Sequence, residues 1–220
     1  MKVGTDGVLL GAWCNIGNCH RVLDIGAGTG LMSLMIAQRA PNATIDAVEI
    51  DHEAYDEAKV NFAESPWHDR LNVICEDFNE YATQCQIKYD LIVSNPPFFM
   101  DGVLPPDSSR KNARHCNTLS FEGLLAGAAD LLVSDGRLCM ISPFDCKNMI
   151  EQISRGCKLF KKNMTIVYPK PNSAPKRILW EFTKSNYEVT EQEKLTIEVG
   201  ERHCYSDEYV ALTKEFYLKM

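Results

Sequence analysis

The sequence lacks any apolar run close to the ~20 residues that a membrane-spanning helix needs. It opens Met1-Lys2-Val3-Gly4-Thr5-Asp6, without the apolar stretch or the cleavage site of a secretory signal. None of the nine cysteines pairs with another at Cys-x-x-Cys spacing, so a zinc or dithiol redox site is not indicated and we expect reduced thiols. These absences predict a cytoplasmic protein with no membrane or metal partner, and we infer no obligate protein partner.

Internal repeats and low-complexity tracts are also missing. The 220 residues are 45% hydrophobic and 24% charged, which excludes wholesale disorder and provides a sizeable core. We therefore expect one domain over residues 1–220.

Charge is distributed unevenly along the chain. The formal net charge is −7, which by itself argues against a nucleic-acid partner. Residues 1–109, however, hold 6 Lys/Arg against 16 Asp/Glu, whereas residues 110–177 hold 12 against 5. This asymmetry predicts a protein with two different faces.

Apolar β-branched runs alternate with helical stretches, which predicts an α/β fold with a mostly parallel sheet and helices on both faces. Strands are expected at 21–25, 43–49, 71–75, 89–93, 136–141, 164–168 and 177–183, and helices at 31–39, 52–64, 121–133 and 147–160. An earlier helix should begin near Thr5 or Asp6, either of which could cap it. The tail should add a strand around 195–199 and a short helix near 207–214.

The last two strands of this seven-stranded sheet are joined by residues 169–176 alone. Eight residues are too few for a helical crossover, so strand seven should run antiparallel to strand six.

A glycine turn follows the first strand, in the run Val22-Leu23-Asp24-Ile25-Gly26-Ala27-Gly28-Thr29-Gly30. Alternate glycines let the backbone approach a ligand at the carboxyl end of the strand. A dinucleotide fingerprint would need its third glycine at position 31, which is Leu31. We expect Asp24 to point at the ligand, and a carboxylate suits a cationic amino-acid group better than a pyrophosphate.

Acidic residues also follow the next two strands. Glu49 could accept both ribose hydroxyls, and Asp77 could receive an adenine amino group between Ile50 and Phe78, although a capping or surface role competes for each acid. This pattern resembles class I S-adenosylmethionine-dependent methyltransferases, a Rossmann-like family for which an antiparallel seventh strand is typical. The resemblance implies S-adenosylmethionine as cofactor.

The fourth strand runs into Asn95-Pro96-Pro97-Phe98. The Asn95 side chain and the Pro96 carbonyl could accept the two N–H groups of an exocyclic amine, while Phe98 stacks on the base. We also expect Asn95 to border the bound cofactor. The competing interpretation is an ordinary Asn-Pro turn. The motif resembles that of amino-methyltransferases acting on adenine N6, guanine N2 or a glutamine side-chain amide.

Basic residues follow this motif and recur in the last hairpin. A phosphate-binding rim is predicted from Arg110, Lys111, Arg114 and His115, together with Lys170, Lys176 and Arg177.

The opening from Lys2 to Trp13, the Asn-Pro-Pro-Phe motif, residues 113–115 and the tail at 202–209 together resemble the bacterial tRNA1(Val) adenine-N6-methyltransferase family from end to end. That resemblance implies methylation of the adenosine 3′ of the anticodon in a valine tRNA, with Lys2, Thr5 and Asp6 near the methionine end of the cofactor. Family members usually carry a further segment before Met-Lys-Val-Gly-Thr-Asp, so we expect a less covered cofactor and weakened RNA binding. The alternatives are an rRNA guanine-N2 methyltransferase, a protein-glutamine N5 methyltransferase and a non-catalytic RNA-binding relative.

Overall fold

The computed structural model describes residues 4–97, 119–186, 192–201 and 203–218. Its helices are α1 (Thr5–Trp13), α2 (Leu31–Arg39), α3 (His52–Glu64), α4 (Phe78–Gln84), α6 (Phe121–Leu131), α7 (Lys147–Gly156) and α8 (Asp207–Thr213). Its strands are β1 (Arg21–Ile25), β2 (Thr44–Glu49), β3 (Leu71–Cys75), β4 (Tyr89–Ser94), β5 (Leu132–Pro143), β6 (Phe160–Tyr168), β7 (Arg177–Thr183) and β8 (Glu193–Thr196).

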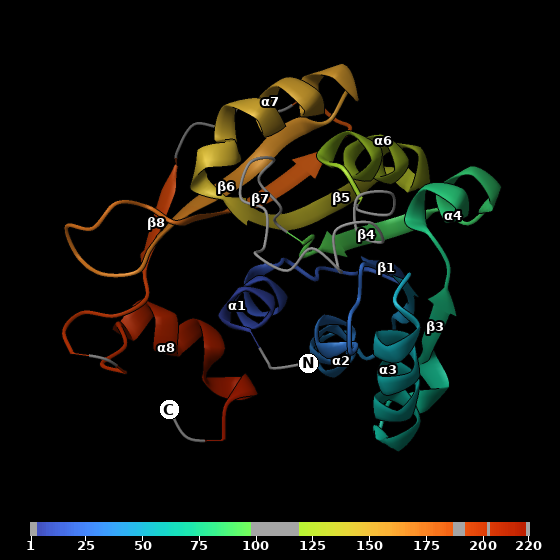
Figure 1. Ribbon diagram of the computed structural model, residues 1–220, viewed down its shortest axis with the longest axis horizontal. Helices are drawn as coiled ribbons and strands as arrows, with labels where there is room; N and C mark the ends of the chain where they lie inside the picture. Colours follow the sequence, from blue (N-terminus) through green and yellow to red (C-terminus); the bar gives the residue numbers. More distant parts are fainter. Residues whose placement is uncertain (1–3, 98–118, 187–191, 202, 219–220) are drawn as a thin grey trace, which may run out of the picture.

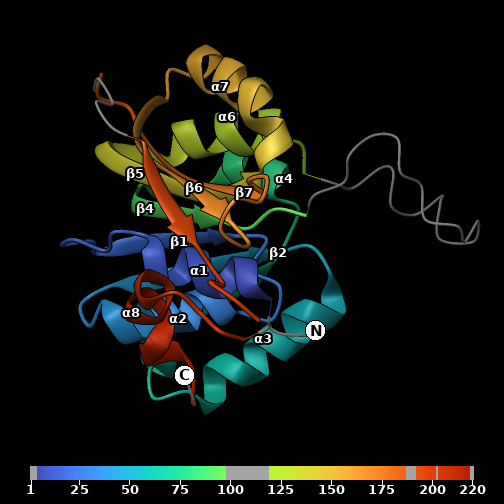
Figure 2. The same ribbon diagram turned by 90° about the vertical axis from the view of Figure 1, so that its left-hand side faces the viewer.

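The strands form one sheet in the order β3-β2-β1-β4-β5-β7-β6-β8. Helices α4, α6 and α7 cover one face, and α1, α2 and α3 cover the other, with α8 beside α1 (Figures 1 and 2). Strand β7 is antiparallel to both β5 and β6, which confirms the prediction drawn from the short loop. Its first residue, Arg177, therefore lies opposite Pro143 at the carboxyl edge of the sheet.

Over the described residues the sheet has eight strands, one more than the seven expected before the tail. The added strand is the one expected in the tail, but it covers Glu193–Thr196 and pairs parallel with β6. Helix α7 is shorter than expected and ends at Gly156, and Lys158 adopts a left-handed φ of 56° before β6 begins at Phe160. The expected cap of α1 is also wrong, because Gly4 takes that position without a side-chain hydrogen bond.

Two apolar cores lie on the two faces of the sheet. In β1, Leu23 and Ile25 belong to the core beneath α6, whereas Val22 joins Leu9 of α1 and Ile36 of α2. This alternation places Asp24, a buried carboxyl between the apolar Leu23 and Ile25, on the α2 side.

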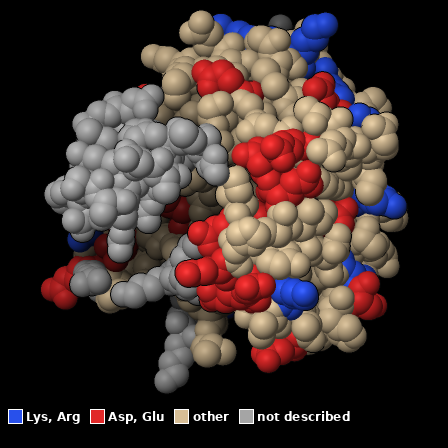
Figure 3. Space-filling view, turned by 45° about the vertical axis from the view of Figure 1, so that its right-hand side comes forward, with Lys and Arg blue, Asp and Glu red and all other residues tan. Residues whose placement is uncertain are grey.

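The uneven charge of the sequence is visible on the surface. Figure 3 brings forward the side with α3, β3 and α4, and Asp and Glu gather there in several patches, whereas Lys and Arg are scattered, mostly along the top and right margins. The eight described cysteines are free, as expected, and Cys116 lies outside the described residues. Within the described ranges, no helix is both long and apolar enough to cross a membrane.

Candidate active site

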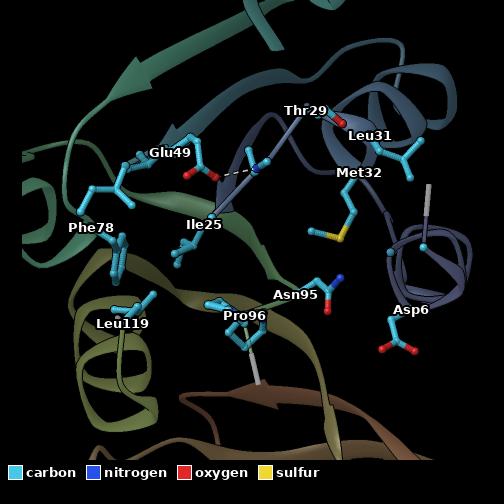
Figure 4. Close-up of a pocket in the computed structure, with 18 of the residues that line it drawn as sticks. Asp6, Ile25, Thr29, Leu31, Met32, Glu49, Phe78, Asn95, Pro96 and Leu119 are labelled. Carbon is cyan, nitrogen blue, oxygen red and sulfur yellow. Dashed lines mark hydrogen bonds between the residues drawn. The ribbon is translucent and has the colours of Figure 1, made fainter. Parts of the chain in front are cut away.

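A cavity of about 670 Å³ opens at the carboxyl ends of β1, β2 and β4, against the first turn of α1 (Figure 4). It brings together most of the predicted cofactor and catalytic residues: Thr5, Asp6, Gly26, Gly28, Glu49, Ile50, Asp77, Phe78, Asn95, Pro96 and Pro97. Asp24 and Gly30 do not line it. Lys2 and Phe98 lie outside the described residues.

Two glycines of the turn, Gly26 and Gly30, have different functions. Gly26 (φ 69°) faces the cavity, and a Cβ placed there would meet nothing within 4 Å. Gly30 (φ 82°) is buried instead, and a Cβ there would lie 2.3 Å from Cε1 of Phe62 in α3. Although we expected Gly30 to contact the cofactor, it does not line the cavity, and the Phe62 contact shows that this glycine lets α3 pack against the turn.

Glu49 is held in a fixed orientation at the end of β2. Its Oε2 accepts a hydrogen bond from the Gly28 amide at 2.7 Å (Figure 4). Its Oε1 accepts one from the Asp51 amide at 2.8 Å. Only 8% of Glu49 is exposed. Each oxygen keeps a further lone pair, so the carboxylate can still accept hydroxyl donors from the cavity.

Asp77 is both the N-cap of α4 and part of the cavity wall. Its Oδ1 accepts hydrogen bonds from the Asn79 amide at 2.7 Å and from Asn79 Nδ2 at 3.0 Å. Asp77 therefore does cap a helix, which was the alternative to adenine binding considered from the sequence. Capping orients its carboxyl beside two apolar side chains, the buried Phe78 and the 39% exposed Ile50.

Asp24 lies beneath the glycine turn and does not line the cavity, although we expected its carboxyl to point at the ligand. Its Oδ2 accepts hydrogen bonds from the Ser33 amide at 3.1 Å and from Ser33 Oγ at 2.7 Å, because its strand position directs it toward α2. Its Oδ1 has no hydrogen-bond partner among the described residues. Complete burial raises the pKa of Asp24 to about 7, against the opposing effect of the Ser33 hydrogen bonds.

This burial predicts a pH-dependent stability. Because the folded-state pKa of Asp24 exceeds the unfolded value, the group destabilises the fold progressively as pH rises from about 4 to 7. We therefore compare the unfolding free energy of Asp24→Asn with that of the unsubstituted chain. We expect the advantage of the variant to grow by about 2–3 kcal/mol as pH rises from 5 to 8. Urea unfolding of both proteins at the two pH values measures it, and a difference that stays constant with pH contradicts it.

Asn95 follows β4 at the centre of the cavity, between Phe78 and Asp6 in the view of Figure 4. The preceding residue anchors the strand end, since Ser94 Oγ donates to the Ile25 carbonyl at 2.9 Å. Asn95 Oδ1 is buried and has no partner within the described part of the chain. A buried carbonyl oxygen without a donor is costly, which marks a position where a ligand N–H can bind.

Several cavity residues were not found by sequence reasoning: Gly4, Gly7, Ile25, Ala27, Thr29, Leu31, Met32, Val48, Glu76 and Leu119. Most are immediate neighbours of predicted residues on the same loops. Leu119 carries no comparable signal, because it precedes α6 and reaches the site only through the packing of that helix.

The basic residues are only partly described. Lys170 and Lys176 are exposed in the loop between β6 and β7, on the same sheet edge as the cavity, and Lys170 Nζ lies 3.8 Å from Glu198 Oε2. Arg177 is engaged within the protein, since its Nε donates to Asp6 Oδ2 at 2.8 Å. Arg110, Lys111, Arg114 and His115 lie outside the described residues.

Comparison with known proteins agrees with this architecture. A family model described as methyltransferase small domain matches residues 8–167. A crystal structure of a predicted O-methyltransferase from Agrobacterium tumefaciens superposes with a TM-score of 0.72 at 19% identity, covering 96% of both chains. The sheet with its reversed β7 and the cavity at the strand ends define a class I methyltransferase.

Closer relatives narrow the family. The tRNA1(Val) (adenine(37)-N6)-methyltransferase of Bacteroides fragilis strain YCH46 is 48% identical over 221 residues, covering 100% of this chain and 92% of the relative. The enzyme of that name from Flavobacterium johnsoniae is 44% identical over 222 residues, covering 100% and 94%. The chain belongs to the tRNA1(Val) (adenine(37)-N6)-methyltransferase family.

The cofactor of this methyltransferase is S-adenosylmethionine. The residues present fit it. Gly26 leaves open space for a close approach, Glu49 presents an oriented carboxylate, and Phe78 with Ile50 supplies apolar surface for an adenine ring.

Proposed function

We propose that this chain transfers a methyl group from S-adenosylmethionine to N6 of the adenosine that follows the anticodon of a valine tRNA. The observation that carries the proposal is the buried, unpartnered Asn95 Oδ1 in the same cavity as the strand-end acids. The choice of base and of tRNA follows the names of the full-length relatives.

The cavity residues divide between nucleoside and amino-acid recognition. We assign Glu49 to the ribose hydroxyls and Asp77 to the adenine amino group, with Ile50 and Phe78 against the ring. Gly26 and Gly28 allow close approach of the backbone, and Thr5 and Asp6 lie at the methionine end. When bound, the cofactor supplies an electrophilic methyl group on a sulfonium.

Asn95 and Pro96 act on the substrate amine. The Asn95 Oδ1 and the Pro96 carbonyl accept the two N6 hydrogens, which leaves the nitrogen lone pair directed into the cavity. No general base is needed before transfer, because the amine loses its proton after it has become cationic. Catalysis by these residues is therefore chiefly orientation, and Phe98 is assigned to stack on the base.

An anticodon-loop base suits this arrangement because it is already partly unpaired, so its extrusion costs less than in a duplex. Lys170 and Lys176 support a phosphate-binding rim at the sheet edge that the base must approach, and we extend the rim to Arg110, Lys111, Arg114 and His115. The tRNA substrate places the proposed activity in the cytoplasm.

A methylation assay tests the proposal. The chain is incubated with methyl-labelled S-adenosylmethionine and either bulk tRNA or bulk rRNA, and the RNA is digested to nucleosides. We expect label in N6-methyladenosine from tRNA alone. Labelled N2-methylguanosine from rRNA would instead establish the guanine-N2 methyltransferase. A parallel incubation with cellular protein in place of RNA tests the protein-glutamine methyltransferase, which label in glutamine would establish.

A further inference from the structure

An ion pair joins the first turn of α1 to the start of β7. Arg177 Nε donates to Asp6 Oδ2 at 2.8 Å, across 171 residues of sequence. Both side chains are partly buried, with 32% of Arg177 and 27% of Asp6 exposed. Arg177 Nη1 also donates to the Lys176 carbonyl at 3.0 Å, which fixes the guanidinium at the sheet edge.

This pair acts on a wall of the cofactor cavity. Gly4, Thr5, Asp6 and Gly7 all line the cavity, and the N-cap Gly4 makes no side-chain capping bond. The far end of α1 is held separately, because Trp13 Nε1 donates to Thr165 Oγ1 at 3.0 Å. The Arg177 contact therefore anchors the end of α1 that borders the cavity.

We propose that Arg177 is a positioning residue of the cofactor pocket, which acts through Asp6 by holding the first turn of α1 in place. This function differs from the phosphate contact that the sequence suggested for it. The proposal rests on S-adenosylmethionine as cofactor and does not depend on which base is methylated.

The charge of Arg177 and its positioning contact predict opposite effects on cofactor affinity when the residue is replaced, which makes the proposal testable. S-adenosylmethionine carries a sulfonium and an ammonium against one carboxylate, so removing a nearby positive charge should tighten its binding if charge alone mattered. Loss of a positioning contact should weaken it. The product S-adenosylhomocysteine lacks the sulfonium, so a charge effect would differ between the two ligands and a positional effect would be shared.

The experiment is calorimetric titration of the full chain with each ligand, without RNA. We expect Arg177→Gln to raise Kd about fivefold to twentyfold for both ligands, and Arg177→Lys to give an intermediate value. The matched control is Lys161→Gln, which removes an ion pair of similar geometry (Lys161 Nζ to Glu151 Oε1, 2.9 Å; 30% and 22% exposed) away from the cavity. It should leave both Kd values unchanged, and thermal unfolding of each variant verifies that it is folded.

The link through Asp6 is tested by a double-mutant cycle. In the Asp6→Asn background, Arg177→Gln should change Kd by less than about twofold, because the contact is already weakened. The proposal is overturned if Arg177→Gln changes Kd by the same factor with Asp6 as with Asn at position 6. It is also overturned if Arg177→Gln tightens the binding of S-adenosylmethionine but not that of S-adenosylhomocysteine. An unchanged Kd with weaker tRNA binding and a flatter salt dependence overturns it in favour of a phosphate contact. None of these outcomes depends on the proposed methylation of adenine.

Discussion

Asn95→Ala is expected to lower the turnover of methyl transfer by about two to three orders of magnitude, similar to the loss of one oriented hydrogen-bonding group in other active sites. The reason is that the substrate amine loses one of its two acceptors, so its lone pair is no longer aimed at the methyl group. Cofactor affinity should change by less than about threefold, because most of the proposed cofactor contacts come from other strand ends. Steady-state kinetics with tRNA and calorimetry with S-adenosylmethionine measure the two quantities separately.

Asn95→Asp provides the control for this prediction. A carboxylate keeps an oxygen acceptor at the same position, so we expect it to retain more turnover than alanine does. If alanine instead weakened cofactor binding as much as it reduced turnover, Asn95 would belong to cofactor binding and the orientation mechanism would be wrong.

Gly30→Ala is expected to destabilise the fold by about 3 kcal/mol or more. The added Cβ combines a left-handed backbone with a clash against the ring of Phe62, which is buried and cannot retreat into solvent. The matched variant is Gly26→Ala, which has a similar positive φ but open space around its Cβ. It should cost only about 1 kcal/mol in stability.

The two glycines should show the reverse order in cofactor binding. Gly26→Ala places a methyl group at the cavity and should raise the Kd for S-adenosylmethionine about tenfold, whereas the folded fraction of Gly30→Ala should bind almost normally. Urea unfolding and calorimetry measure the two effects. Equal destabilisation by both substitutions would show that backbone strain, and not the Phe62 contact, explains why glycine occupies position 30.

Much of the architecture follows from local patterns. The range of β1, the ranges of α2 and α3, and the reversal of β7 were predicted from apolar periodicity and the length of one loop. The functions of Gly30 and Asp24 were not, because each depends on a partner distant in the sequence: Phe62 in α3 and Ser33 in α2. A motif identifies which residues gather at a turn, but it does not say which of them face the ligand.

The remaining differences have the same origin. Asp6 was expected to cap α1, but its carboxylate is occupied by Arg177, a contact that no local pattern indicates. Helix α4 was not predicted because it is only seven residues long and begins immediately after Asp77. Its first residues were therefore interpreted only as part of the ligand site. The strand β8 is short, with two of its four residues exposed, and its pairing with β6 determines its range.

The reversed strand β7 also affects the order in which the site can form during synthesis. Asp6 leaves the ribosome early, but its partner Arg177 and the Thr165 that binds Trp13 are made more than a hundred residues later. The acids and glycines that follow β1 to β3 all come from the first half of the chain. The first turn of α1 is therefore the earliest part of the cavity to be translated and the last to be anchored, so incomplete chains should lack a closed cofactor pocket.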